Sequence, residues 1–528
     1  MAELPIQYQI ADDHSIDEIV TTLSSHFYLG NEPKKVVRRI YCDTFDWRIY
    51  QAGAVLYEEH NSSGHWLVWR YLGAERPKEM LRLDGKMPRF SWDFPPGLLR
   101  DLVTPEVAMR ALLPQVEVRS QVRVLKLFDQ QEKTVLRLAL EEHGARLPNK
   151  GEYISLTSTV QVMPVRGYPK PLARMVRFLS SEMKMQPVTG EQINAALAVV
   201  DRQPVDYSSK LDFKLKQGMR ADAVAREIHL HLLSTMETNL PGTRADLDSE
   251  FLHDLRVAVR RTRSALTQVK GVFPTEVVER YKERFAWVGQ VTSPTRDMDV
   301  YLLDFGGYRD SLPDQFRDDL EPLQRFLLNH QKSEHRAMVR KLNSPHFHSL
   351  VKEWRSYLES PLPEDPDEPN ASRVIREVAS KRIYSIYRRV MKEGAAITPL
   401  SPADDLHELR KSCKKLRYLL EFFQSLYPRK QIRPLIKAQK VLLDNLGDFQ
   451  DLEVQANKLR DYAHQMIKEE EVPADTLLAM GMLVDSLLKR QQEAREEFST
   501  RFNAFAEREI RATFQSLFAT KEKREKRA

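Results

Sequence analysis

The stretch Leu252-His-Asp-Leu-Arg-Val-Ala-Val-Arg-Arg-Thr-Arg-Ser-Ala-Leu266 recurs without a gap as Leu406-His-Glu-Leu-Arg-Lys-Ser-Cys-Lys-Lys-Leu-Arg-Tyr-Leu-Leu420. His253 of the first copy aligns with His407 of the second, at an offset of 154 residues. A second pair, Arg296-Asp-Met-Asp-Val300 and Gln450-Asp-Leu-Glu-Val454, keeps the same offset. A constant register over this span is typical of an internal duplication. The sequence therefore predicts a helical domain whose two related halves are arranged about a pseudo-twofold axis.

Each copy carries a stripe of cations along one side of its predicted helix. At 3.6 residues per turn, the histidine and three arginines of the first copy fall within an arc of roughly 80 degrees. The first stripe is His253, Arg256, Arg260 and Arg263, and the second is His407, Arg410, Lys414 and Arg417, with Lys411 and Lys415 on its other flank. Leucines occupy the arc beside each stripe, so the cations border the buried face. We expect the two stripes to face each other across a groove.

Such a concentration of like charges on one helix face calls for an anionic partner, because like charges at i,i+4 destabilise a helix. Guanidinium groups bind phosphate oxygens in pairs and ammonium groups act as point charges, so the mixture suits a repeating phosphate chain. The predicted binding residues are His253, Arg256, Arg260, Arg261, Arg263, His407, Arg410, Lys411, Lys414, Lys415, Arg417, Arg382 and Arg389. A solvated basic face with packing histidines is the alternative, and the recurrence in register favours binding.

The carboxylates of the second signature are interpreted as structural. Asp297, Asp299 and Asp451 are expected to form salt bridges with the arginines or to cap a helix. The second copy offers Asp451 and Glu453 but no further ligand at a fixed spacing. We therefore predict no metal site, no cofactor and no catalytic residue.

Composition and charge indicate a globular protein of two or three domains. The chain has 528 residues, 42% hydrophobic and 30% charged, with 81 Lys and Arg against 75 Asp and Glu, which excludes collagen-like and low-complexity classes. The two cysteines, Cys42 and Cys413, show no CxxC spacing, which argues for a reducing compartment and against a zinc cluster. No apolar window approaches 18 residues and no signal peptide is recognised. We expect a cytoplasmic protein without a membrane partner.

The predicted secondary structure changes near residue 205, from mixed strands and helices to helices alone. Short β-rich runs are predicted at Trp66–Tyr71, Val122–Phe128, Thr134–Leu140 and Tyr153–Met163. Amphipathic helices are predicted at Ala221–Thr238, Glu250–Val272, Glu276–Val291, Glu321–Leu342, Arg373–Lys392, Asp404–Tyr427, Arg433–Leu446, Asp451–Glu469 and Ala474–Phe518. A segment rich in proline and acid, residues 360–372, divides them. The predicted domains are 1–205 and 215–515, with halves 215–359 and 372–515, and a basic tail 516–528.

The paired signatures at 252–263 with 296–300, and at 406–418, resemble the CHAD family, the conserved histidine α-helical domain. The likeness covers about residues 215–515. It implies a two-lobed helical bundle that binds inorganic polyphosphate through its basic helices, and a location at polyphosphate granules.

The N-terminal part resembles a degenerate CYTH domain, the triphosphate-tunnel fold, which implies an antiparallel β-barrel. Tyr41-Cys-Asp-Thr-Phe-Asp46, Arg119, Arg123 and Ala139-Leu-Glu-Glu-His-Gly144 carry the resemblance. The family's acidic opening appears here as Glu3-Leu-Pro5-Ile-Gln7, and Leu56-Tyr57-Glu58-Glu59 replaces its arginine pair. A tunnel hydrolase needs acids to hold a divalent cation and bases to hold the triphosphate. We therefore predict that this domain is not an enzyme.

Two other functions stay open at this point. The first is a metal-dependent triphosphate or polyphosphate hydrolase in residues 1–205, with Glu3, Arg119, Arg123 and Glu141 as its remnants. The second is nucleic-acid binding, which basic helices permit but which no groove-reading or base-stacking motif supports. The oligomeric state and the preferred polyphosphate chain length are not predicted.

Overall fold

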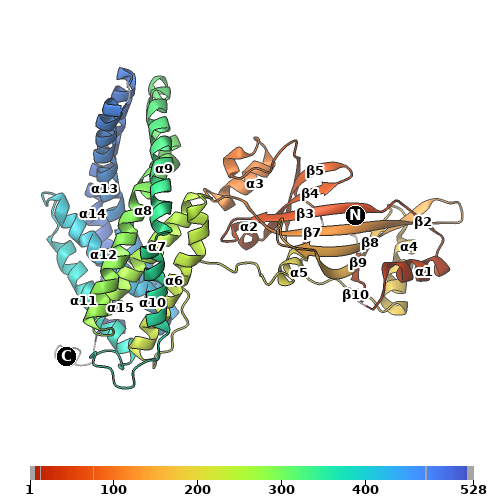
Figure 1. The fold of residues 1–528 in the computed structure, drawn as a ribbon, viewed down its shortest axis with the longest axis horizontal. Coiled ribbons are helices and arrows are strands. Elements are labelled where there is room, and N and C mark those ends of the chain that lie inside the picture. The colour runs from red at the N-terminus through yellow and green to blue at the C-terminus, as the bar shows by residue number, and fades with distance from the viewer. Residues whose placement is uncertain (1–5, 12, 75, 470–471, 520–528) are drawn as a thin grey trace. The chain divides into compact units, whose positions relative to one another are not determined.

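The computed structural model describes residues 6–11, 13–74, 76–469 and 472–519. The chain divides into two compact units, Met1–Ser208 and Ser209–Ala528 (Figure 1). The first unit is α+β with an antiparallel sheet and the second is all-α, so the predicted fold class is confirmed.

Ten strands of the first unit form one antiparallel sheet. They are β1 Ile6–Gln9, β2 Leu29–Asn31, β3 Lys35–Asp43, β4 Ala54–Asn61, β5 Gly64–Tyr71, β6 Glu79–Arg82, β7 Leu113–Phe128, β8 Thr134–Arg146, β9 Ile154–Pro164 and β10 Gln186–Pro187. The order is β10-β1-β9-β8-β7-β3-β4-β5-β6, with β2 paired to β7. Each of the four predicted strands is confirmed, in β5, β7, β8 and β9. In this order, β10 and β6 are the terminal strands.

Helices cover the sheet of the first unit in three places. They are α1 Ile16–His26, α2 Arg48–Gln51, α3 Leu98–Val107, α4 Pro169–Arg177 and α5 Gln192–Ala198, with a 3₁₀ turn at Ser91–Asp93 and a π turn at Phe178–Glu182. α1 starts at Ser15, which forms a capping box with Glu18. α1 and α4 share one apolar core, α5 a second and α3 a third.

The second unit consists of two matching series of helices. The first series is α6 Ala221–Arg244, α7 Ser249–Gln268, α8 Thr275–Asp310, α9 Glu321–Leu342 and α10 Pro345–Glu359, with 3₁₀ turns at Asp314–Phe316 and Asp318–Leu320. The second is α11 Ile375–Ala396, α12 Ala403–Phe423, α13 Arg429–Glu469, α14 Ala474–Phe505 and α15 Arg508–Phe518, with a 3₁₀ turn at Gln424–Leu426. α11, α12 and α13 begin 154 residues after α6, α7 and α8, so the predicted duplication is confirmed.

Three predicted helix ends are wrong. α8 continues through Pro294 to Asp310, α13 has no break at Gly447, and a separate α15 follows α14. Pro294 costs α8 one backbone hydrogen bond, but Met298 and Tyr301 beyond it are buried and hold the helix together. Tertiary packing of this kind commonly overrides local propensity.

Two apolar cores hold the helical unit together. The larger core joins α6, α7, α10, α11, α12 and α15 with parts of α8, α13 and α14. The smaller core fills the projecting end where α8, α9, α13 and α14 pack (Figure 1). Gly394 allows the close approach of α11 and α14, because a Cβ there would lie 2.0 Å from a ring carbon of Phe502. Among the described residues, none of the helices has the length and apolar character needed to cross a lipid bilayer.

Candidate functional site

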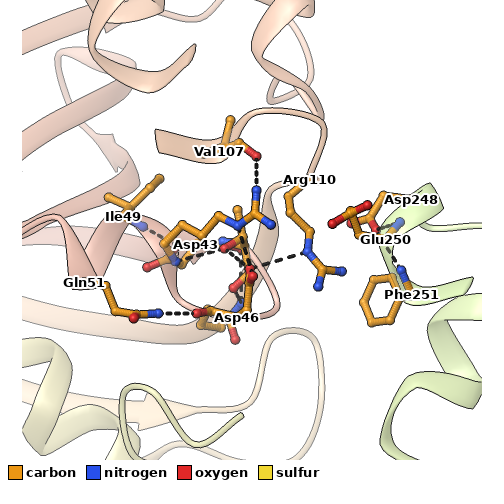
Figure 2. A network of polar contacts seen from close by, with 12 residues as sticks. Asp43, Asp46, Ile49, Gln51, Val107, Arg110, Asp248, Glu250 and Phe251 are labelled. Atoms are coloured by element: carbon orange, nitrogen blue, oxygen red, sulfur yellow. Dashed lines mark hydrogen bonds and ion pairs between the residues drawn. The ribbon is translucent and has the colours of Figure 1, made fainter. Parts of the chain in front are cut away.

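The two repeated helices, α7 and α12, contact each other through charged side chains. Asp248 fixes the start of α7, where its carboxylate accepts hydrogen bonds from the backbone N–H groups of Glu250 and Phe251 at 2.9 and 3.2 Å (Figure 2). Further along α7, Arg261 donates to one oxygen of Glu421 at 3.1 Å, and Arg417 of α12 donates to the other at 2.7 Å. One carboxylate therefore ties the first repeat to the second.

Four other cations of these helices form what we call the inter-repeat cluster: Arg256, Arg260, Arg410 and Lys414. Burial and the neighbouring charges of Arg410 and Arg260 together lower the pKa of Lys414 to about 8, although Asp451 opposes them. Because Arg260 lies on α7 and Lys414 on α12, the two stripes repel each other across the repeat boundary. Like charges held together in a partly dehydrated place favour an anion between them.

Arg256 is held in place by neutral groups. Its Nη1 donates to the backbone carbonyl of Gly289 at 2.9 Å and to the hydroxyl of Thr292 at 2.8 Å, both on α8. Burial and the neighbouring Arg260 lower the pKa of Arg256 to about 10, although Asp297 raises it. No carboxylate among the described residues forms an ion pair with Arg256, and its buried Nε has no hydrogen-bond partner there. Neutral acceptors therefore hold this guanidinium in place.

Arg410 occupies the equivalent position in the second repeat but is differently engaged. Its Nη2 contacts both carboxylate oxygens of Asp451, at 3.0 and 3.1 Å, and its Nη1 donates to Gln450 at 2.6 Å. Only 12% of the Arg410 side chain is exposed, against 63% of Asp451. The two halves therefore differ at this position, because Arg410 forms an ion pair with a carboxylate and Arg256, within the described part of the chain, does not.

The predicted salt bridge to an arginine is confirmed for Asp451, which pairs with Arg410. Asp297 pairs with a lysine, Lys458, at 2.5 Å. Asp299 instead accepts a hydrogen bond from Gln331 at 3.3 Å, and burial raises its pKa to about 6.

The two histidines of the repeats have different surroundings. Nδ1 of His253 accepts a hydrogen bond from Arg296 at 3.1 Å, and since a guanidinium can only donate, this nitrogen carries no proton. His253 therefore joins the two signature motifs of the first half. His407 is half-buried. The hydrogen bond from Lys411 and the charge of that residue lower the pKa of the neighbouring Glu408. Lys411 pairs with that carboxylate at 2.8 Å.

The remaining predicted cations lie on α7 and α11. Arg382 of α11 donates to Gln268 of α7 at 2.7 Å, and burial together with Arg389 lowers its pKa. Arg263 and Arg389 are exposed. The structure thus packs α12 against both α7 and α11, while a groove between them stays a prediction.

An acidic cavity of about 890 Å³ lies between α8, α13 and α14. Its charged lining is Asp304, Asp444, Asp448, Asp451, Glu493, Glu497, Arg490 and Arg501. Burial raises the pKa of Asp448, and the nearby Asp444 and Asp451 raise it further. This excess of carboxylates repels a polyanion.

In the first unit, the four residues expected to remain from a hydrolase are not gathered in one place. Glu3 lies outside the described residues. Arg123 pairs with Asp17 at 2.7 Å, and it stands opposite Leu140 across the β7–β8 pair. Glu141 stands opposite Val122 and therefore projects from the other face of the sheet. Arg119 projects from the same face as Arg123 and lies 6.0 Å from the ring of Tyr153.

The segment Tyr41–Asp46 has a clear structural role at the end of β3. The buried carboxylate of Asp43 accepts hydrogen bonds from three backbone N–H groups, those of Thr44, Ile49 and Tyr50, at 2.7 to 2.9 Å. Asp46 contacts Arg110, and its carbonyl accepts from Gln51 (Figure 2). These contacts shape the turn into α2, so this motif is explained without a ligand.

Sequence reasoning missed a buried polar network under α5. Gln192 of α5 accepts a hydrogen bond from Tyr41 at 3.0 Å and contacts His143 at 3.3 Å. Arg39 pairs with Glu59 at 2.8 Å on the same face. Burial lowers the pKa of His143 to about 4. The alternation of polar residues in β3 and β4 was the available signal, but the covering helix lies 150 residues away in the chain.

Comparisons with known proteins find similarities to parts of this chain. A family profile described as CHAD domain matches residues 227–460. The CHAD domain from the plant Ricinus communis is similar to this chain with 22% identity and a TM-score of 0.46, covering 58% of this chain and 96% of that one. A search of curated proteins finds no match.

Solved structures similar to the N-terminal part include CYTH-like proteins. A putative adenylate cyclase from Bacillus halodurans has 12% identity and a TM-score of 0.26, covering 36% of this chain and 95% of its own. A putative adenylyl cyclase from Hippeastrum, described as having a dominant triphosphatase activity, has 11% identity and a TM-score of 0.26, covering 39% of this chain and 99% of its own.

Proposed function

Residues 227–460 of this chain are a CHAD domain, and from this premise we propose that the protein binds inorganic polyphosphate at the inter-repeat cluster. The observation that carries the proposal is the gathering of cations at the repeat boundary, where the charge of Arg260 on α7 helps to lower the pKa of Lys414 on α12. A phosphate chain laid between α7 and α12 would relieve that repulsion. It would also supply acceptors to Arg256, which no described carboxylate pairs with.

The unbranched chain of phosphates suits this cluster better than a nucleic acid does. Guanidinium groups on two facing helices contact phosphate oxygens without needing bases to stack or pair. Among the described residues of α7 and α12, the stripes carry no exposed aromatic platform of the kind that single-strand binders use. Polyphosphate is therefore the preferred polyanion in this proposal.

Binding of fluorescently labelled long-chain polyphosphate to the full chain tests the proposal directly. We expect saturable binding whose affinity falls steeply with salt, because each neutralised phosphate releases counterions. Single-stranded DNA at matched phosphate concentration should compete poorly. An affinity that is independent of salt, or equal competition by DNA, would contradict polyphosphate binding at a cationic cluster.

The proposal extends to location and to the first unit. A polyphosphate-binding protein is expected in the cytoplasm at polyphosphate granules, which fluorescence microscopy of a tagged chain would check. The first unit is proposed to be non-catalytic, because Arg123 and Glu141 project from opposite faces of the sheet. Release of phosphate from triphosphate with Mg²⁺ or Mn²⁺, lost in Glu141→Ala, would instead support the hydrolase.

Asp451 is expected to weaken polyphosphate binding, because its carboxylate occupies Arg410. Replacing it by asparagine removes one negative charge beside the cluster and frees the guanidinium. We expect Asp451→Asn to tighten binding about threefold, since exposed ion pairs are worth less than about 1 kcal/mol. Asp485→Asn is the matched control, because it also removes a carboxylate from an ion pair, with Lys489, in the same unit. Equal affinities for both variants would contradict this role of Asp451.

A further inference from the structure

One hairpin of the first unit collects two histidines and a glutamate on one face. Glu58 and His60 are two residues apart on β4, so their side chains project to the same side. His65 of β5 stands directly opposite His60 across the β4–β5 pair. The hairpin register therefore places all three side chains together, independently of any other part of the fold.

The distances between the three groups match those between the ligands of one metal ion. Oε2 of Glu58 lies 2.9 Å from Nε2 of His65 and 3.5 Å from Nε2 of His60. All three ligand atoms lie within 4.8 Å of one another, and no other such group of three occurs in the part of the chain that the structure describes. Ligands about 2.0 to 2.1 Å from a tetrahedral zinc ion lie about 3.4 Å apart.

From this geometry we infer that Glu58, His60 and His65 form a binding site for a divalent transition-metal ion, with Zn²⁺ as the best fit. Two imidazoles and one carboxylate are a ligand set that zinc uses where it keeps one position open. Imidazole nitrogen also favours zinc over Mg²⁺, which prefers oxygen ligands. The site is separate from the inter-repeat cluster and from the proposed polyphosphate function.

The surroundings of the three residues agree with this use. The side chains of Glu58, His60 and His65 are 15%, 39% and 22% exposed, so an ion can enter from solvent while the ligands remain held by the sheet.

Two features of the site affect the free energy of metal binding. The two imidazole rings are stacked, with centroids 3.9 Å apart, so they must turn apart slightly for both Nε2 atoms to converge on one ion. The guanidinium of Arg38 lies opposite His60 on β3, but it pairs with Glu117 at 2.5 Å. Its positive charge is thus largely compensated and does not oppose the ion at full strength.

Titration of the untagged full chain with Zn²⁺, followed by calorimetry, tests the inference. We expect one ion per chain, a rise in melting temperature of the first unit, and visible d–d absorption when Co²⁺ replaces Zn²⁺. His60→Ala and His65→Ala should each weaken binding at least about tenfold, and Glu58→Gln should weaken it as well.

His14→Ala is the matched control, because His14 also lies beside a carboxylate, that of Asp13, at 3.4 Å in the same unit. It should bind Zn²⁺ like the original chain. Circular dichroism without metal should be the same for all variants, and excess Mg²⁺ should not displace the Zn²⁺. Absence of binding, binding that survives both histidine substitutions, or displacement by Mg²⁺ would overturn the assignment.

Discussion

Replacing Arg256, Arg260, Arg410 and Lys414 together by alanine is expected to weaken binding of long-chain polyphosphate by about three orders of magnitude at 0.1 M salt. The reason is counterion release. Each cation that neutralises a phosphate contributes a slope of about −0.7 to the dependence of log affinity on log salt for a single-stranded polyanion. Loss of four contacts should therefore reduce the slope by about 3. Fluorescence anisotropy at several salt concentrations measures both the affinity and the slope.

A variant with the same loss of charge provides the control for this experiment. Alanine at Lys332, Arg336, Arg340 and Lys341 of α9 removes the same number of cations from the helical unit, but these are exposed and lie away from the repeated helices. It should lose less than about tenfold in affinity and keep nearly the original slope. If both variants lose affinity equally, the net charge of the protein, and not the cluster, accounts for polyphosphate binding. Equal circular dichroism spectra would show that the fold survives both sets of substitutions.

The duplication and its basic helices could be predicted from the sequence because both depend on local periodicity. Leu255 and Leu409 mark the buried face of each helix, and the cations follow at helical spacing, so no long-range information is needed. The engagement of each cation could not be predicted in this way. Arg256 and Arg410 are equivalent in sequence, yet only Arg410 meets a carboxylate. That difference arises from the packing of α8 and α13, which only the tertiary structure supplies.

The hairpin site differs from the cation cluster, because the sequence spacing alone is enough to bring its three residues together. Glu58, His60 and His65 are at strand spacing around a tight turn, which is enough to place them together. The family resemblance explains Glu58 and Glu59 only as replacements for an arginine pair. The pairing of His60 with His65 across the hairpin is what brings Glu58 into a possible ligand set.

The crowding of cations at the cluster has opposite consequences for folding and for binding. In the free protein the pKa of Lys414 is lowered from 10.5 to about 8, so between these values the unfolded chain binds more protons than the folded one. Stability of the free protein therefore rises with pH across this interval. A bound phosphate chain raises the pKa of Lys414 again, because it supplies the missing negative charge.

Polyphosphate affinity is therefore expected to fall as pH rises through about 8. Below pH 7 Lys414 is charged before the ligand arrives, whereas at pH 9 a proton must be taken up on binding. We expect about tenfold weaker binding at pH 9 than at pH 7, since one pKa unit corresponds to a factor of ten. In Lys414→Arg the side chain stays charged at both values, so this decline should disappear. Lys415→Arg is the matched control and should keep the decline. A pH profile that is the same in Lys414→Arg as in the original chain would show that Lys414 is not part of the binding surface.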